Sequence, residues 1–106
     1  MEVNKDFSGK KKTFLKLEGK NILVTGGAGF IGSHLVDALV LSKCNVIVLD
    51  IEVKLKSYFK SQKLGERVKL IKCDVRNFKY VCDIVKKNKI DYIFHLAAEA
   101  IVEETL

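Results

Sequence analysis

The sequence contains no proline and no tryptophan, and its three cysteines form no C-x-x-C pair. An odd number of cysteines without metal-ligand spacing predicts reduced structural thiols rather than disulfides or a metal centre. No apolar run approaches the length needed to span a bilayer, and residues 1–6 lack the apolar core of a signal peptide. From these absences we expect a cytoplasmic protein that neither crosses a membrane nor binds a metal.

Positive charge is in excess: the formal net charge is +6, from 19 basic and 13 acidic residues. Basic chains often bind nucleic acid, but only Lys10–Lys12 forms a cluster here, and the remaining excess is spread thinly. A solvated, lysine-rich surface is the favoured interpretation, so nucleic acid is not an expected partner. We expect a polar, basic lead-in over residues 1–19 and one folded domain over residues 20–106.

A strand, a glycine cluster and a helix are indicated in that order between Asn21 and Asp37. Gly26, Gly29 and Gly32 form the pattern Gly-x-x-Gly-x-x-Gly. The first glycine would permit a sharp turn. The second would let a phosphate approach the backbone, and the third would let the helix pack closely. The N–H groups and positive dipole end of the helix would then face an anion.

The nearest competing motif is the mononucleotide P-loop, which needs a lysine after its last glycine. Gly27 and Gly32 have the P-loop separation, but Ser33 and His34 follow, so the phosphate-binding lysine is absent. A phosphate-free turn is the other alternative. It is disfavoured because strand and helix flank the glycines as the dinucleotide mechanism requires.

Asp50 ends the second predicted strand, about 20 residues beyond the glycines, where a dinucleotide site needs an acidic residue. Its carboxylate can accept hydrogen bonds from both ribose hydroxyls and would repel a 2′-phosphate. We therefore predict NAD as the cofactor. The nearby Lys54 and Lys56 keep NADP as the less favoured alternative.

Apolar runs alternate with helical spacing along the chain, which predicts parallel βαβ units with right-handed crossovers. Strands are expected at residues 21–25, 45–49, 67–72 and 91–95, and helices at about 30–42 and after the capping residue Asn77. The predicted fold class is α/β: a Rossmann-type parallel sheet with helices on both faces, strand order 3-2-1-4, truncated. The cofactor would bind at the carboxyl ends of the first and fourth strands.

The buried stripes of these helices follow from apolar spacing. They are expected at Ile31, Leu35 and Leu39 in the first helix and at Phe78, Val81, Cys82 and Val85 in the second. A weaker helical pattern runs through Leu55, Tyr58 and Phe59, with Gly65 as a suitable C-cap.

The segment Thr-Gly-Gly-Ala-Gly-Phe-Ile-Gly-Ser-His, residues 25–34, resembles the cofactor fingerprint of the extended short-chain dehydrogenases/reductases. Those are NAD-dependent epimerases and dehydratases that act mostly on nucleotide sugars. The classical branch would need a glycine at the position of Ile31. The resemblance implies that Phe30 and Ile31 join the three glycines as cofactor-binding residues.

Two further segments resemble this family. Asp74 and Val75 resemble the pair that flanks adenine, where the carboxylate accepts from the exocyclic amine. The run from His95 resembles the H-x-A-A segment, which implies that Leu96, Ala97 and Ala98 lie near the nicotinamide-side ribose. His95 is expected to support the fold rather than to act as a catalytic base.

The family's chemistry uses a tyrosine with a lysine four residues later. None of the three tyrosines, Tyr58, Tyr80 and Tyr92, has a lysine at that position. The resemblance therefore implies the N-terminal cofactor-binding part only, with no catalytic residue, of a UDP- or dTDP-sugar 4-epimerase or 4,6-dehydratase. A non-catalytic dinucleotide-binding module or a gene remnant is the alternative. An open edge at the fourth strand would favour a homo-oligomer.

Overall fold

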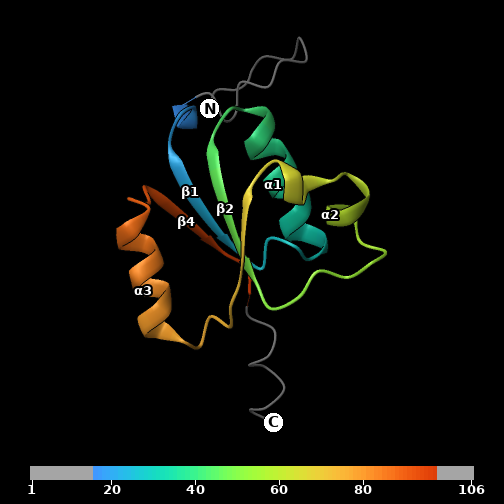
Figure 1. Ribbon diagram of the computed structural model, residues 1–106. Helices are drawn as coiled ribbons and strands as arrows, with labels where there is room; N and C mark the ends of the chain where they lie inside the picture. Colours follow the sequence, from blue (N-terminus) through green and yellow to red (C-terminus); the bar gives the residue numbers. More distant parts are fainter. Residues whose placement is uncertain (1–15, 98–106) are drawn as a thin grey trace.

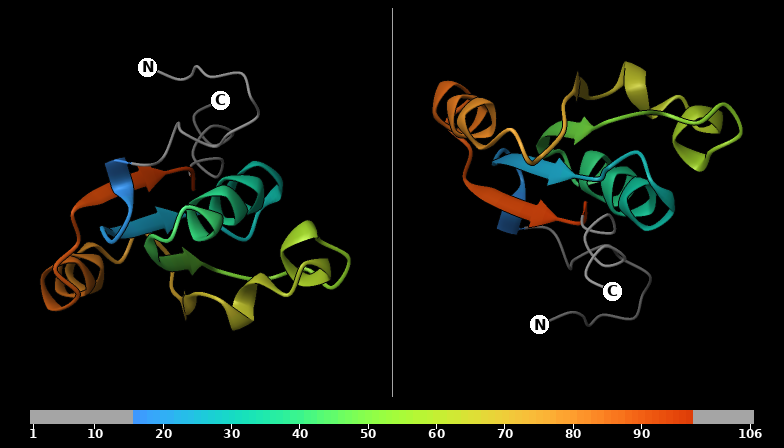
Figure 2. Two further views of the ribbon diagram at one scale, coloured as in Figure 1. Left: turned by 90° about the horizontal axis from the view of Figure 1, so that it is seen from above. Right: turned by 90° about the horizontal axis from the view of Figure 1, so that it is seen from below.

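A computed structural model describes residues 16–97 as a four-stranded parallel sheet with helices on both faces (Figures 1 and 2). The strands are β1 (Asn21–Thr25), β2 (Asn45–Asp50), β3 (Lys69–Lys72) and β4 (Tyr92–His95). The helices are α1 (Phe30–Leu41), α2 (Tyr58–Ser61), the 3-10 helix η2 (Leu64–Glu66) and α3 (Phe78–Lys87). The order β3-β2-β1-β4 confirms the predicted topology.

The two central strands are buried on both faces, as the near-continuous apolar runs of β1 and β2 require. One face meets α1, α2 and η2 in a core formed by Ile22, Val24, Ala28, Val36, Leu39, Val46, Val48, Phe59 and Leu64. The alternate residues Leu23, Ile47 and Leu49 pack with Ile84 of α3 on the opposite face. Figure 2 shows α1 and α3 on these two sides of the sheet.

The predicted buried stripe of α1 is correct at Leu39, which is buried, and at Leu35, which packs against the core, and it is wrong at Ile31. Ile31 is 70% exposed, whereas Ser33, Val36 and Leu39 are buried. The helix begins hard against the glycine turn, so its first inward-facing residues are Gly32 and Ser33. The Ser33 hydroxyl donates to the Gly29 carbonyl oxygen at 2.6 Å, which satisfies this buried polar group.

For α3, the predicted capping residue Asn77 is correct, and the predicted buried stripe is wrong at Phe78. The Asn77 side chain caps the helix by accepting from the Tyr80 backbone N–H at 3.3 Å. Val81 and Val85 pack against the core, but the buried residue of α3 is Ile84, and Phe78 is 74% exposed. Phe78 lies in the first turn, at the carboxyl edge of the sheet, beyond the reach of the core.

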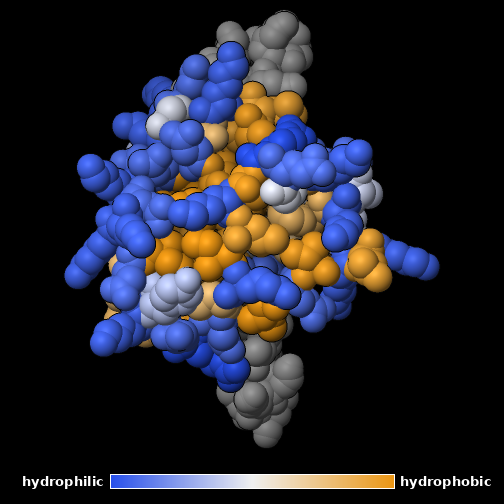
Figure 3. Space-filling model, viewed as in Figure 1, coloured by the Kyte–Doolittle hydropathy of each residue, from blue (hydrophilic) through white to orange (hydrophobic). Residues whose placement is uncertain are grey.

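Residues 51–66 form less helix than their spacing predicts. The α2 helix has only one turn and follows a loop in which Leu55 is 81% exposed. Gly65 lies inside η2 rather than at a C-cap, and β3 begins at Lys69 rather than at Arg67. In Figure 3, apolar side chains gather in the middle of one face, between the α3 and α2 sides, and hydrophilic side chains surround them. Over residues 16–97, no helix has the length and apolar character that a membrane crossing needs.

Candidate functional site

The glycine turn joins β1 to α1 at the carboxyl edge of the sheet. Gly26 has φ +75°, a conformation that favours glycine. A Cβ at Gly26 would also come within 2.9 Å of the Ala97 backbone nitrogen and the Leu96 carbonyl carbon. The residue is therefore fixed as glycine both by its backbone conformation and by the chain that crosses it after β4.

Gly32 brings α1 onto this turn. A Cβ at Gly32 would lie 2.1 Å from the Gly26 carbonyl oxygen and 2.9 Å from the Gly27 Cα. The close packing that the sequence predicts for this glycine is therefore present, and it is made with the turn backbone rather than with the strand.

Gly29 differs from its two partners because the space in front of it is open. A Cβ there would meet only the Gly26 carbonyl oxygen, at the ordinary contact distance of 3.5 Å. Gly29 is also the N-cap of α1, where no side chain caps the helix and no acidic residue lies in the first turn. Among the described residues, no capping side chain therefore satisfies the positive end of this helix, which is the kind of position that binds anions.

Asp50 ties the end of β2 to the glycine turn. Its Oδ2 accepts from the Ala28 backbone N–H at 2.9 Å, and its Oδ1 accepts from the Ile51 N–H at 2.8 Å. A carboxylate has about four acceptor positions, so about two remain for a ligand. This arrangement fits a pair of ribose hydroxyls beside the turn.

A cleft of about 890 Å³ opens at this carboxyl edge. Its walls include most of the residues that the sequence predicts at the cofactor: Gly26, Gly29, Phe30, Asp50, Asp74, Val75, Leu96 and Ala97. Gly32 lies beneath the turn, and the exposed Ile31 is not among the lining residues. Ala98 lies outside the described residues.

Arg76 also lines the cleft, and the sequence reasoning missed it. Its guanidinium lies 2.6 Å from the Asp74 carboxylate, whereas the Lys54–Glu52 pair of the same cleft is 3.9 Å apart. The hydrogen bonds from the Arg76 side chain, followed by the one from its backbone N–H, hold the pKa of Asp74 down at about 2. Asp74 is therefore ionised near neutral pH. The Asp-x-Arg spacing allows such a contact at a strand-to-helix turn, where an aspartate side chain often bonds to nearby backbone N–H groups.

An aromatic cluster supports the wall of the cleft near α1. The His34 ring stacks on Tyr58 with centroids 3.9 Å apart, and Phe30 meets His34 edge-on at 5.1 Å. The Tyr58 hydroxyl donates to Asp37 Oδ2 at 2.6 Å, and this hydrogen bond raises the pKa of Tyr58. These contacts join α2 to α1 and so fix the loop that follows Asp50.

His95 anchors the end of β4. Its Nδ1 lies 2.7 Å from the Thr25 hydroxyl oxygen, and the Leu96 backbone N–H donates to that oxygen at 3.1 Å. This contact with the buried Thr25 agrees with the expected role of His95 in supporting the fold.

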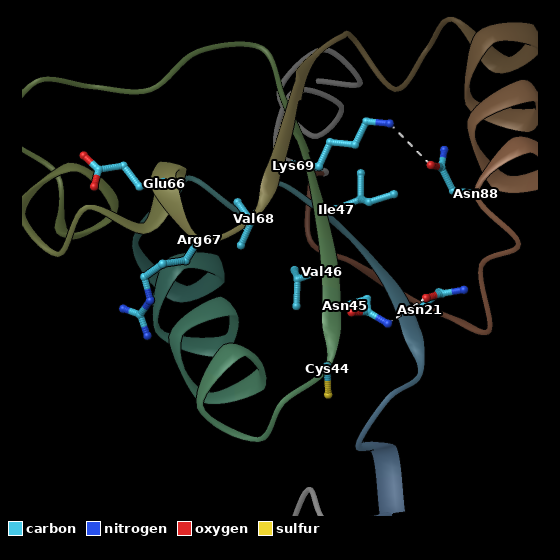
Figure 4. A pocket seen from close by; sticks show the side chains of 10 residues that line it. All are labelled: Asn21, Cys44, Asn45, Val46, Ile47, Glu66, Arg67, Val68, Lys69 and Asn88. Atoms are coloured by element: carbon cyan, nitrogen blue, oxygen red, sulfur yellow. Dashed lines mark hydrogen bonds between the residues drawn. The ribbon is translucent and has the colours of Figure 1, made fainter.

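A second, smaller hollow of about 430 Å³ lies at the opposite edge of the sheet (Figure 4). Its amides bond to protein groups: Asn45 donates to Asn21 at 3.1 Å, and Lys69 donates to Asn88 at 3.4 Å. Ligands of open α/β sheets bind outside the carboxyl ends of the strands. The larger cleft at the glycine turn is therefore the candidate site.

Comparisons with known proteins find epimerases and dehydratases as similar sequences and structures. The family model described as GDP-mannose 4,6 dehydratase matches residues 23–106. A UDP-glucose 4-epimerase from Neisseria meningitidis serogroup A is 36% identical over 95 residues, covering 82% of this chain and 26% of the relative. An epimerase structure from Methanothermobacter thermautotrophicus has a TM-score of 0.64 at 36% identity, covering 81% of this chain and 25% of that one. A dTDP-glucose 4,6-dehydratase from Bacillus anthracis, solved with NAD, has a TM-score of 0.65 at 30% identity, covering 78% and 28%.

The sheet order and the glycine turn define a Rossmann-type α/β protein. Because the family match extends over most of the sequence, the chain belongs to the NAD-dependent epimerase/dehydratase family. The family resemblance of residues 25–34 is thereby confirmed. The chain spans about a quarter of the length of the relatives that it matches.

Proposed function

We propose that this chain is the NAD-binding, N-terminal portion of a UDP- or dTDP-sugar 4-epimerase or 4,6-dehydratase. The observation that carries the proposal is the hydrogen bond from the Ala28 N–H to Asp50, because it holds a carboxylate beside the glycine turn, where a dinucleotide site needs a ribose-binding acid. Several relatives were solved with NAD, and their names support the nucleotide-sugar assignment. We place the binding domain at residues 20–106, after a lead-in of residues 1–19, in a cytoplasmic protein.

The lining residues divide the cleft into parts that suit the parts of NAD. The pyrophosphate would lie at Gly29 and the N-terminus of α1, and the adenosine ribose at Asp50. Adenine would lie against Asp74 and Val75. The segment from Leu96 onward would approach the nicotinamide-side ribose. NAD, when bound, supplies the hydride acceptor, and the described residues bind and orient it.

Calorimetry of the 106-residue chain with NAD and with NADP tests this proposal. We expect NAD to bind more tightly than NADP and to raise the melting temperature, since it binds only the folded form. At a concentration of about 100 times Kd, NAD would add about 2.7 kcal/mol of stability. Absence of both binding heat and a thermal shift would refute the proposed function. A tighter complex with NADP would refute only the role of Asp50.

We do not expect turnover from this chain alone, because none of its tyrosines is followed by a lysine four residues later. Sequencing the DNA beyond codon 106 separates the two functional classes. A continuation that encodes Tyr-x-x-x-Lys supports the enzyme, and its absence supports a non-catalytic dinucleotide-binding module. Epimerase activity of the purified chain on a UDP-sugar would contradict this part of the proposal.

We also propose self-association through β4, which among the described strands pairs only with β1. Tyr92 and Ile93 are 48% and 50% exposed on this edge strand. Unprotected edge strands pair with other chains. Light scattering should show a mass that rises with protein concentration, and Ile93→Lys should reduce that rise. A monodisperse monomer at every concentration would contradict the oligomer.

A further inference from the structure

The aromatic cluster beside α1 connects two walls of the cleft through a residue that lies outside it. Phe30 and Tyr58 line the cleft, and His34 contacts both without being a lining residue. The His34 ring stacks on Tyr58 with centroids 3.9 Å apart and an interplanar angle of 23°, and it meets Phe30 edge-on at 5.1 Å. Phe30 is 77% exposed, so the core contributes little to its position. The His34 ring therefore supports both side chains.

Tyr58 is held from its other end. Its hydroxyl donates to Asp37 Oδ2 at 2.6 Å, and Arg67 lies 3.7 Å from Asp37 Oδ1. The Tyr58 ring therefore presents a fixed face to His34. Because Tyr58 follows the loop after Asp50, part of which lines the cleft, the stack joins the first turn of α1 to the ribose side of the cleft.

We propose that His34 is a positioning residue of the dinucleotide site: its ring holds Phe30 and Tyr58 in the cleft wall, and its protonation raises the affinity for the dinucleotide. This inference rests on the proposed function, because it assumes that the pyrophosphate lies at Gly29. It goes further by adding a residue outside the cleft and a dependence of binding on pH.

The sign of the pH dependence follows from the charges around the ring. Histidine is the side chain that ordinarily changes charge between about pH 5 and pH 8. Along the helix, His34 is about 7.5 Å from Gly29, which is within one Debye length of about 10 Å at 0.1 M salt. A pyrophosphate at Gly29 would therefore favour the imidazolium form.

The other charges near His34 belong to the protein itself. Asp37 of the same helix favours the imidazolium, whereas Arg67 and the positive end of α1 oppose it. Tyr58, on α2, is the titratable group that stacks on the ring. These groups are present with and without ligand, so they largely cancel when affinities are compared, and the pyrophosphate decides the sign. Binding should therefore take up protons, and affinity should rise as the pH falls.

Two variants separate the ring from its charge. His34→Phe keeps an aromatic ring between Phe30 and Tyr58 and removes the titration. His34→Ala removes both. The only other histidine, His95, is present in every variant, so its own titration contributes equally to all of them.

The test is calorimetric titration of the full chain with NAD at pH 5.5, 6.5 and 7.5, in buffers of different ionisation heat, alongside ligand-free melting curves. Wild-type affinity should be about two- to fivefold higher at pH 5.5 than at pH 7.5, with proton uptake at pH 6.5. His34→Phe should show the wild-type affinity of pH 7.5 at all three pH values, without that uptake. His34→Ala should bind about three- to tenfold more weakly than His34→Phe, because two aromatic contacts are lost.

The outcomes separate the two levels of the argument. If the wild type does not bind NAD at any pH, the proposed function fails, and this inference fails with it. If the wild type binds with constant affinity and no proton uptake, or His34→Phe keeps the wild-type pH dependence, the function stands and the role of the His34 charge is overturned. If His34→Ala binds as tightly as His34→Phe, the positioning role is overturned. Should His34→Ala show no folded state, His34→Leu, which fills the space without an aromatic ring, takes its place in this comparison.

Discussion

Gly29 offers the sharpest test of the site, because a substitution there changes the ligand space and leaves the protein packing intact. Its backbone, at φ −77° and ψ −178°, is extended and open to any residue. An added Cβ meets protein only at 3.5 Å. Gly29→Val therefore introduces a side chain where the pyrophosphate would lie, and its Cβ makes only an ordinary contact with the described residues.

The expected effects on stability and binding differ in size. Replacing an N-cap glycine costs up to about 1 kcal/mol, and the stiffer unfolded chain returns about 0.4–1 kcal/mol. The net change in unfolding free energy should stay within about 1 kcal/mol. Displaced phosphate oxygens would lose at least two charge-assisted hydrogen bonds of about 1.5–3 kcal/mol each. NAD affinity should therefore fall by about 100-fold or more.

The assay is calorimetric binding of NAD by wild type, Gly29→Ala and Gly29→Val, with melting curves recorded without ligand. Affinity should fall in that order as the side chain grows. Gly65→Val is the matched control, because its Cβ would make only an ordinary contact of 3.6 Å with Phe59, away from the cleft. Unchanged NAD affinity in Gly29→Val, with a normal melting curve, would refute the placement of the pyrophosphate.

Three other changes test neighbouring parts of the site. Asp50→Ala should narrow the gap between NAD and NADP affinities, and a constant ratio in calorimetry would show that Asp50 does not read the ribose. Gly32→Ala should destabilise the chain by about 1–3 kcal/mol or more in urea unfolding, because its methyl group would lie 2.1 Å from a backbone oxygen; wild-type stability would contradict this packing. Asp74 has a pKa of about 2, below its ordinary 3.8, so its contribution to stability is complete above about pH 4 and is lost as the pH falls towards 2. Asp74→Asn should remove this part of the acid-induced loss in unfolding measured between about pH 5 and pH 2, and an identical acid profile would contradict it.

The strands and their order were predictable because their signals are local. The apolar runs of β1 and β2 are those of strands buried on both faces, and a glycine turn followed by a helix fixes the crossover. Gly26, Gly32 and Asp50 were identifiable for the same reason: each sits at a defined distance from a strand end. Their residue types follow from the backbone around them.

The residues that point inward from the first turn of each helix were less predictable, because they depend on contacts between distant segments. The exposed Ile31 and the buried Ser33 show that contact with the glycine turn, rather than apolar spacing, decides which residues of the first turn of α1 point inward. Phe78, in the first turn of α3, is likewise exposed although its spacing predicts that it is buried. The ion pair between Arg76 and Asp74 depends on side-chain directions at a turn, and composition and spacing do not determine those directions.

The turn after β1 is where segments far apart in the sequence meet. Gly32 of α1 and the backbone of Ala97 both lie close to Gly26. Asp50 of β2 accepts a hydrogen bond from the Ala28 N–H. All of these contacts are made between residues 26 and 97. Under the proposed function, dinucleotide binding would depend on this turn, and chemistry on a sugar would depend on a tyrosine–lysine pair that the 106 residues do not contain.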